Sequence, residues 1–301
     1  MVLKYEDLTY EEISELDREK TVFLVSIAPL EEHSYYLPVG VDHFNSEFFA
    51  TDAAQKFEQQ NPEYTVVLHP ALAIGSDCFR FPGTIDIPQK GIYLVAKGIG
   101  ASLAARGFKN VMFIGLHGGP RHIVALEQAC RAVNRKYKAN LVAPFGGVLI
   151  KMFMDRSFME EVLEREIDDD EWFKIERDLH AGFIETSLML HHHPDLVKPS
   201  YKTANEFPKR LWDMWKRPSE KNGWEGMIGY PALASKEKGD ELAEKMSAYF
   251  QTVLNDWIFK NNIEEYKSSV VSKAPFFNVY FSDIIKLVVV TVLFLIVIIL
   301  L

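Results

Sequence analysis

Apolar segments of strand length alternate along this chain with longer segments of helical spacing, and this alternation restricts the fold more than any other feature. Residues 22–27 form an apolar run that is typical of a strand covered on both faces. Similar runs predict further strands at 65–74, 111–116 and 141–144, and helical spacing predicts helices at 45–60, 90–106, 123–137, 184–191 and 236–260. Strands that alternate with helices indicate an α/β fold with a mainly parallel sheet and helices on both faces.

The composition excludes several other classes of protein. The 301 residues are 48% hydrophobic and 25% charged, which rules out a mainly disordered, collagen-like or disulfide-scaffold chain. The net charge is −9, and we expect no nucleic-acid partner because phosphate contacts need clustered Lys and Arg. The two cysteines, Cys78 and Cys130, fit a reducing compartment or serve as small core residues.

The C-terminal end differs in composition from the rest of the chain. Residues 284–301 contain Lys286 as their one charged residue, and a helix of this length would span roughly 27 Å, close to a thin hydrocarbon core. The lysines that precede the apolar run place the globular part in the cytoplasm by the positive-inside tendency. We therefore expect a catalytic domain at 1–262, a connector at 263–283 and a single-pass tail anchor in membrane lipid at 284–301. A buried element is the alternative.

Polar side chains follow two of the predicted strands and open one predicted helix. In a parallel α/β sheet, ligands bind beyond the carboxyl ends of the strands, so these side chains are candidates for a functional site. They are Glu31, Glu32, His33, Asp42, His117, His180 and Glu185. A mixture of imidazole and carboxylate suits Zn²⁺, Mn²⁺ or Fe²⁺. Taken singly, Glu31 and Glu32 could also be solvated loop acids, and His117 a satisfied polar residue.

Five blocks of sequence together resemble the creatininase family, which contains creatinine amidohydrolase and its relatives. The blocks are Pro29-x-Glu31-x-His33 with Leu37-Pro38 and Asp42; Gly75-Ser76 with Phe81-Pro82-Gly83-Thr84; His117-Gly118-Gly119; His180-Ala181-Gly182 with Glu185-Thr186-Ser187; and Gly229-x-Pro231 with Ala234 and Gly239. Their order and spacing cover about residues 20 to 250. The resemblance implies a three-layer α/β/α fold, two divalent metal ions (Zn, Mn or Fe) and a homo-oligomer.

The resemblance also implies metal ligands. Glu31 and His117 would bind one ion, and His33 would bind the other. Asp42 would bridge the two ions, since a carboxylate can offer one oxygen to each. Glu185 would be a ligand or an acid beside the second ion.

The resemblance further implies the chemistry. His180 would pass a proton to the leaving nitrogen, and Ser76, Gly118 and Gly119 would contact a small-molecule or peptide amide. The expected function is a membrane-tethered amidohydrolase that cleaves the C–N bond of a cyclic amide, a formamide or a modified peptide. Creatinine-cleaving members have a glutamate where Gly119 stands, so creatinine is not the expected substrate. The alternative is a catalytically decayed binding or scaffold module at the membrane.

Two further features have more than one interpretation. His191, His192 and His193 end a predicted helix, where cations are favourable, although a metal cluster is the alternative. Three tryptophans, at 212, 215 and 224, could form a lid that shields a site from water, or could serve an interface or a core.

Overall fold

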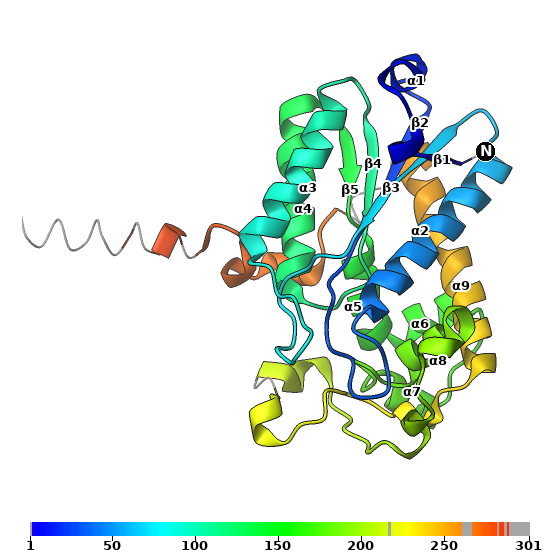
Figure 1. Cartoon of the computed structure of the whole chain (residues 1–301), viewed down its shortest axis with the longest axis vertical. Coiled ribbons are helices and arrows are strands. Elements are labelled where there is room, and N and C mark those ends of the chain that lie inside the picture. Colours follow the sequence, from blue (N-terminus) through cyan, green and yellow to red (C-terminus); the bar gives the residue numbers. More distant parts are fainter. Residues whose placement is uncertain (1, 216–217, 261–266, 282, 286–287, 289–301) are drawn as a thin grey trace, which may run out of the picture.

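The computed structural model describes residues 2–215, 218–260, 267–281, 283–285 and 288 (Figure 1). Its strands form one five-stranded sheet in the order β1-β3-β2-β4-β5, and every pair of neighbours is parallel. The strands are β1 (Leu3–Lys4), β2 (Thr21–Ile27), β3 (Thr65–Leu72), β4 (Asn110–Ile114) and β5 (Asn140–Val142). All seven residues of the central strand β2 are buried, as its apolar sequence predicts. The predicted parallel α/β sheet is therefore confirmed.

Helices cover both faces of this sheet (Figure 1). The first face is covered by α3 (Gln89–Ala104) and α4 (Pro120–Tyr137), the second by α2 (Val41–Gln60) and α9 (Lys236–Asn255). Successive residues of a strand point to opposite faces, so β2 supplies both apolar cores. Its Phe23 and Val25 belong to the core under α3 and α4, and its Val22 and Leu24 to the core under α2 and α9.

Several elements do not follow from the alternating pattern. They are α1 (Tyr10–Glu15), α5 (Phe145–Met154), α6 (Arg156–Leu163) and α7 (Asp169–Ile175), which lie outside the predicted helices, and the two-residue strand β1. The charges of residues 155–176 suggest an exposed segment, yet α6 buries Phe158 and Leu163. Asp155 and Asp168 cap α6 and α7 by accepting backbone N–H bonds. Here acidic residues mark helix starts rather than a surface loop.

The remaining elements connect this framework. Helix α8 (Phe183–His192) packs on α9 and carries residues of the candidate site. A π-helical turn (Asp256–Lys260) extends α9. Short 3₁₀ turns are formed by Tyr5–Asp7, Pro194–Leu196, Pro199–Thr203, Leu211–Trp215, Glu220–Asn222, Pro231–Leu233, Val270–Lys273 and Pro275–Phe277.

The described part of the predicted connector, residues 267–281 and 283, packs against the domain. The backbone N–H of Ser269 donates to Glu127 Oε1 at 2.9 Å, and that of Val279 donates to Gln128 Oε1 at 3.0 Å. Glu127 and Gln128 both belong to α4, so this segment packs against the helices that cover the first face of the sheet. The domain boundaries themselves stay a prediction.

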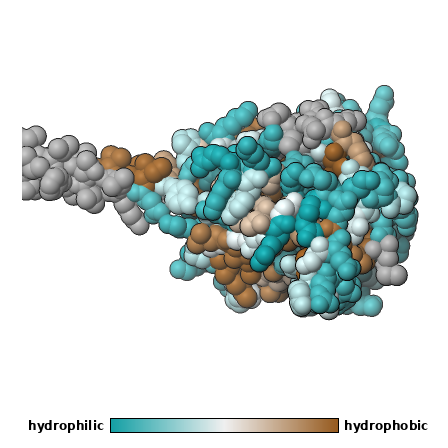
Figure 2. All heavy atoms as spheres, turned by 90° about the horizontal axis from the view of Figure 1, so that it is seen from above, coloured by the Kyte–Doolittle hydropathy of each residue, from teal (hydrophilic) through white to brown (hydrophobic). Residues whose placement is uncertain are grey.

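The predicted membrane anchor is not supported. Within the described residues, no helix has the length and apolar character that a membrane crossing requires. The expected localisation, a single-pass membrane protein with its domain in the cytoplasm, is contradicted by this finding. Most of the predicted span, residues 286–287 and 289–301, lies outside the described residues. Ile284, Ile285 and Val288 are about half exposed. The face of the molecule shown in Figure 2 is mostly hydrophilic, with smaller hydrophobic patches.

The three consecutive histidines at the end of α8 have different environments. Nδ1 of His191 lies 2.7 Å from Asp240 Oδ1, and Nε2 of His192 lies 2.7 Å from Asn45 Oδ1. Burial, together with the charges of His193 and His191, lowers the pKa of His192 to about 3. The expectation of cations at this helix end is therefore wrong for His192, which is neutral at pH 7. The three residues form no metal-ligand group among the described side chains.

His192 should make the fold sensitive to acid. Its folded pKa is about 3 and its unfolded pKa about 6.5, so the unfolded chain takes up the proton first. Stability is then fully present above pH 6.5 and is lost as the pH falls towards 3, by at most about 1.4 kcal/mol per pH unit. In His192→Gln, the free energy of unfolding should fall less steeply between pH 6.5 and 4.5. Urea denaturation at several pH values measures this, and an unchanged slope would refute the assignment.

Candidate metal centre

The candidate residues collect where the carboxyl ends of β2 and β4 meet α2 and α8. The structure brings together all six side chains for which the sequence suggests a metal or proton-transfer role. Their residues are almost completely buried, with exposed fractions of 1% for Glu31, 0% for His33, 2% for Asp42, 5% for His117 and 6% for His180. Only the Glu185 side chain is more open, at 24%. Buried charged groups need partners or metal ions, so this cluster requires an explanation.

Asp42 lies at the middle of the cluster, in the first turn of α2. Its Oδ2 lies 2.9 Å from Nδ1 of His117, and its Oδ1 lies 3.4 Å from Nε2 of His33. The two oxygens of one buried carboxylate therefore face two different histidines. The positive end of the α2 dipole stabilises a carboxylate at this position.

The first ligand group consists of Glu31, Asp42 and His117. Nδ1 of His117 lies 3.1 Å from Glu31 Oε2, in addition to its contact with Asp42. The other ring nitrogen, Nε2, lies 3.1 Å from the carbonyl oxygen of Ser76. A carbonyl can only accept, so this contact assigns the proton to Nε2 and leaves the Nδ1 lone pair between two carboxylates. Metal-binding histidines commonly have this arrangement.

The second group consists of His33, Asp42 and Glu185. Nε2 of His33 lies 3.5 Å from Glu185 Oε2, and it has no hydrogen-bond partner among the described atoms. Nδ1 of the same ring lies 3.1 Å from the carbonyl oxygen of Glu31. An unpartnered buried nitrogen that faces two carboxylate oxygens fits a divalent ion.

Both groups contain buried carboxylates, whose negative charge favours positive charge on the neighbouring histidines or on a bound ion. Burial alone would lower the pKa of His33, but the negative charges of Glu185 and Asp42 outweigh it and hold the pKa well above its ordinary value. The pKa of His117 is raised in the same way by Glu31 and Asp42. Burial would raise the pKa of Asp42, but the two histidines keep it far below its usual range. Without metal this charge must come from protons on the histidines, and metal ions would replace those protons.

His180 lies beside the second group, and its ring centroid is 4.3 Å from that of His33. Its Nε2 lies 2.8 Å from the carbonyl oxygen of Glu32 and 3.4 Å from Glu32 Oε1. Glu32 is 4% exposed, so it is not a solvated loop acid. The loop after β2 directs Glu31 towards His117 and Glu32 towards His180, and the sequence carries no signal of this division.

Aromatic side chains cover His180. The Phe79 ring lies 4.9 Å from His180 and 4.8 Å from Trp224, between centroids. Trp224 is 8% exposed, whereas Trp212 is 68% exposed. Of the three tryptophans considered as a lid, Trp224 thus lies over the cluster, and the side chain of Trp215 is outside the described set.

The three residues predicted to contact substrate lie beside His117. Ser76 is 1% exposed, and its Oγ has no hydrogen-bond partner within the described part of the chain. A side chain at Gly118 would meet no described atom within 4 Å. A Cβ at Gly119 would instead lie 2.4 Å from His117 Nε2. Position 119 therefore has no room for a side chain, and the carboxylate that faces His33 together with Asp42 is that of Glu185 on α8.

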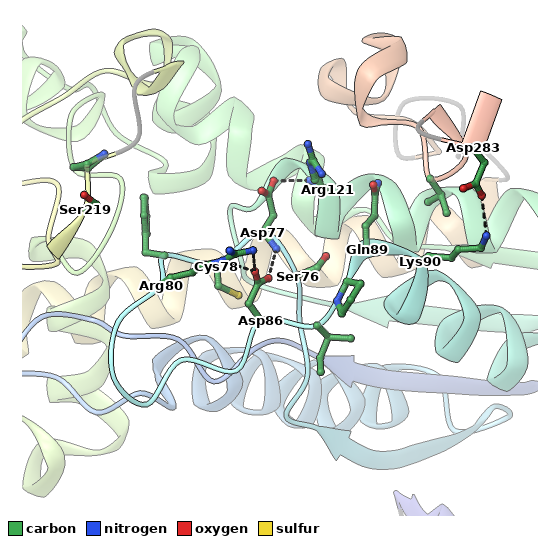
Figure 3. A pocket seen from close by; sticks show the side chains of 15 residues that line it. Ser76, Asp77, Cys78, Arg80, Asp86, Gln89, Lys90, Arg121, Ser219 and Asp283 are labelled. Atoms are coloured by element: carbon green, nitrogen blue, oxygen red, sulfur yellow. Dashed lines mark hydrogen bonds and ion pairs between the residues drawn. The ribbon is translucent and has the colours of Figure 1, made fainter. Parts of the chain in front are cut away.

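A cavity of about 780 Å³ adjoins the cluster through the loop of residues 76–80 (Figure 3). Ser76, Cys78 and Phe79 line it, together with charged side chains such as Arg80 and Arg121. None of Glu31, His33, Asp42, His117, His180 and Glu185 lines this cavity, so it is a space next to the centre rather than the centre itself. Cys78 is the other residue that sequence reasoning missed, since it lies against His117 rather than in an ordinary core position.

The chain matches the family described as creatinine amidohydrolase (creatininase) over residues 6–254. No curated protein matches it. Among solved structures, "Creatininase Mn" has a TM-score of 0.65 at 17% identity and aligns over 86% of this chain and 100% of that chain. A crystal structure of creatinine amidohydrolase (creatininase) has a TM-score of 0.64 at 18% identity, with 86% and 98% covered. A mutant creatininase of the Zn-Zn type has a TM-score of 0.63 at 17% identity, with 86% and 99% covered.

These comparisons agree with the fold and with the sequence blocks. The structural likeness, at identities below 20%, concerns the α/β fold alone. The family match is independent of it and extends over most of the chain, including both ligand groups. This chain therefore belongs to the creatininase family.

Proposed function

We propose that this protein is a metal-dependent amidohydrolase that uses two divalent ions to cleave a C–N amide bond. The family consists of binuclear metal amidohydrolases that act on C–N bonds. The observation that carries the proposal is the position of Asp42, whose two oxygens face two separate buried ligand groups.

Glu31, Asp42 and His117 would hold one ion, and His33, Asp42 and Glu185 the other. This mixture of oxygen and nitrogen donors suits Zn²⁺, Mn²⁺ or Fe²⁺. When bound, such ions supply Lewis acidity, which polarises a carbonyl group and makes water a stronger nucleophile near neutral pH.

His180 would provide the proton that the reaction needs. In amide hydrolysis, water oxygen adds to the carbonyl carbon, the C–N bond breaks, and the leaving nitrogen must be protonated. Burial and the charge of His33 would lower the pKa of His180, but the contact with Glu32 and the charge of Glu31 outweigh them and raise it. A raised pKa favours the protonated imidazole, the form that a general acid requires. Glu32 would hold the imidazole in place.

The surroundings indicate a small substrate or the end of a peptide. Phe79 and Trp224 cover the centre and would exclude bulk water, while Ser76, Gly118 and Gly119 would contact the amide group. A cyclic amide, a formamide and a modified peptide all satisfy these conditions. Creatinine is not proposed, because position 119 lacks a side chain and has no space for one. Assembly as a homo-oligomer stays a prediction.

Hydrolysis assays on protein loaded with Zn²⁺ or Mn²⁺ test this function. Formation of a free amino group from a panel of lactams, N-formyl amines and N-acyl peptides should be detected for at least one class. Activity should disappear after chelation and return with metal. Stoichiometric metal binding without turnover of any class would favour the alternative, a decayed module that only binds partners.

The geometry of the second ligand group predicts that a substitution of Glu185 weakens the binding of one metal ion and not of the other. Replacing its carboxylate in Glu185→Gln should leave the ion at His117 in place and weaken binding of the ion at His33, by roughly 10–100-fold or more. Metal analysis should then give one tightly bound ion per chain rather than two. Glu47→Gln, which changes an acid on α2 with a 55% exposed side chain, serves as the matched control. Two retained ions in Glu185→Gln would show that Glu185 is not a ligand.

A further inference from the structure

We propose that Cys78 is a thiolate ligand of the ion at Glu31 and His117, and that it gives this position a preference for Zn²⁺ over Mn²⁺. The inference rests on the proposed function, because the ion belongs to the same centre. It adds a donor of a different chemical type to the oxygen and nitrogen ligands described above.

The loop that carries Cys78 is fixed to the first ligand group on both sides. The carbonyl oxygen of Ser76 accepts a hydrogen bond from His117 Nε2, and the backbone N–H of Phe79 donates to Glu31 Oε1. Asp77 N–H donates to Asp86 Oδ1 at 3.0 Å and holds the loop from outside. Cys78 lies between these anchors and is 3% exposed, so its side chain has few directions available.

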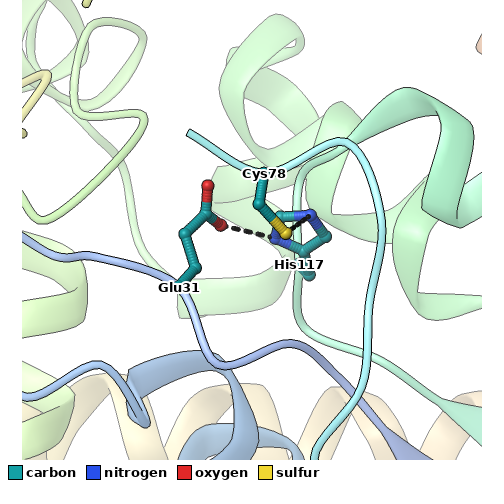
Figure 4. A group of neighbouring side chains, drawn as sticks. All are labelled: Glu31, Cys78 and His117. Carbon is teal, nitrogen blue, oxygen red and sulfur yellow. Dashed lines mark hydrogen bonds and ion pairs between the residues drawn. The ribbon is translucent and has the colours of Figure 1, made fainter. Parts of the chain in front are cut away.

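The sulfur lies beside the His117 ring and contacts its Nε2, whereas the Glu31 carboxylate contacts Nδ1 of the same ring (Figure 4). Sγ of Cys78 lies 4.0 Å from Nε2 of His117, and one ligand atom from each of Glu31, Cys78 and His117 lies within 4.8 Å of the others. Donor atoms on one tetrahedral zinc ion are roughly 3.5 Å apart, given Zn–N and Zn–S bonds of about 2.0 and 2.3 Å. The separations between the three donors, which are at most 4.8 Å, would therefore have to close by at most about 1.3 Å to reach ligand distances.

The chemistry of the donor favours zinc. Thiolate is a soft ligand that selects Zn²⁺, whereas Mn²⁺ prefers carboxylate, carbonyl and water oxygens. With Asp42, the first position has four donors from the chain, the number found in closed zinc sites. The second position has only oxygen and nitrogen donors, and we expect it to exchange its ion more readily.

Cobalt substitution of the full-length protein tests the ligand directly. A thiolate bound to Co²⁺ produces a strong charge-transfer absorption in the near ultraviolet, and this chain has two cysteines to assign. The band should appear in the wild type and in Cys130→Ser, whose cysteine is buried in the core under α3 and α4. It should be absent in Cys78→Ser. Co²⁺ bound stoichiometrically to the wild type without this band would overturn the inference, whatever the fate of the variant.

Competition between Zn²⁺ and Mn²⁺ gives a second readout that does not depend on activity. We expect the preference for Zn²⁺ to fall at least about tenfold in Cys78→Ser, with Mn²⁺ affinity nearly unchanged. Equal Zn²⁺/Mn²⁺ ratios in the wild type and a folded Cys78→Ser would contradict the inference and leave the amidohydrolase proposal intact. Failure of the wild type to bind any of the three ions would instead contradict the proposed function.

Discussion

Replacing Asp42 with alanine should release both metal ions and reduce amide hydrolysis to the background rate. Among the described residues, Asp42 is the one whose side chain faces both ligand groups: its Oδ2 contacts His117, and its Oδ1 lies 3.4 Å from His33. Loss of a neighbouring supporting group typically costs 10–100-fold in metal affinity, so loss of a shared ligand should cost more than about 100-fold at each position. Metal content, measured on the purified protein, should fall from two ions to fewer than one per chain.

Two variants make this result specific. Asp42→Asn keeps the shape and one oxygen acceptor but removes the charge, and it should retain at most one weakly bound ion. Asp52→Ala removes another acid from α2, which pairs with Lys56 at 2.9 Å, and it should bind metal like the wild type. If Asp42→Ala still holds two ions, the bridging position and with it the proposed function are wrong.

The parts of this fold that the sequence predicts are those with a strong periodic pattern. The run at β2 is apolar except for Thr21 and Ser26 because both faces are covered, and α3 and α4 show the spacing of helices that pack on a sheet. β1 has two residues, which is too short for any period to be visible. α6 and α7 are short and begin at acidic caps, and α7 also has three acids in its first turn, so their apolar sides are hard to recognise. Length and charge, rather than an unusual conformation, explain these omissions.

The candidate site could also be predicted only in part from the sequence. Residue type and the carboxyl ends of strands suggest His33 and His117, and resemblance assigns them to two ions. The direction of a side chain in a loop has no period, so nothing in the sequence separates Glu31, which contacts His117, from Glu32, which contacts His180. Cys78 follows the same rule: its type suggests a core residue, and only the folded loop places its sulfur beside His117.

Removing the imidazole in His180→Ala should separate proton transfer from metal binding. We expect kcat to fall about 10²–10⁴-fold, the usual contribution of a general acid, while both ions stay bound. Glu32→Gln should have a smaller effect, because it alters the group that holds His180 rather than the proton donor, and it should shift the pH profile of kcat. Added imidazole should restore part of the activity of His180→Ala, since the substitution leaves a space between Phe79 and His33.

The metal content of His180→Ala decides between two roles. One nitrogen of His180 lies within 4.8 Å of ligand atoms of His33 and Glu185, so His180 is also placed where a third protein donor to the second ion could be. A proton donor leaves the metal content at two ions per chain when it is removed, whereas a ligand does not. Loss of one ion together with activity, without rescue by imidazole, would therefore assign His180 to the second metal position. The proton donor would then have to be another group.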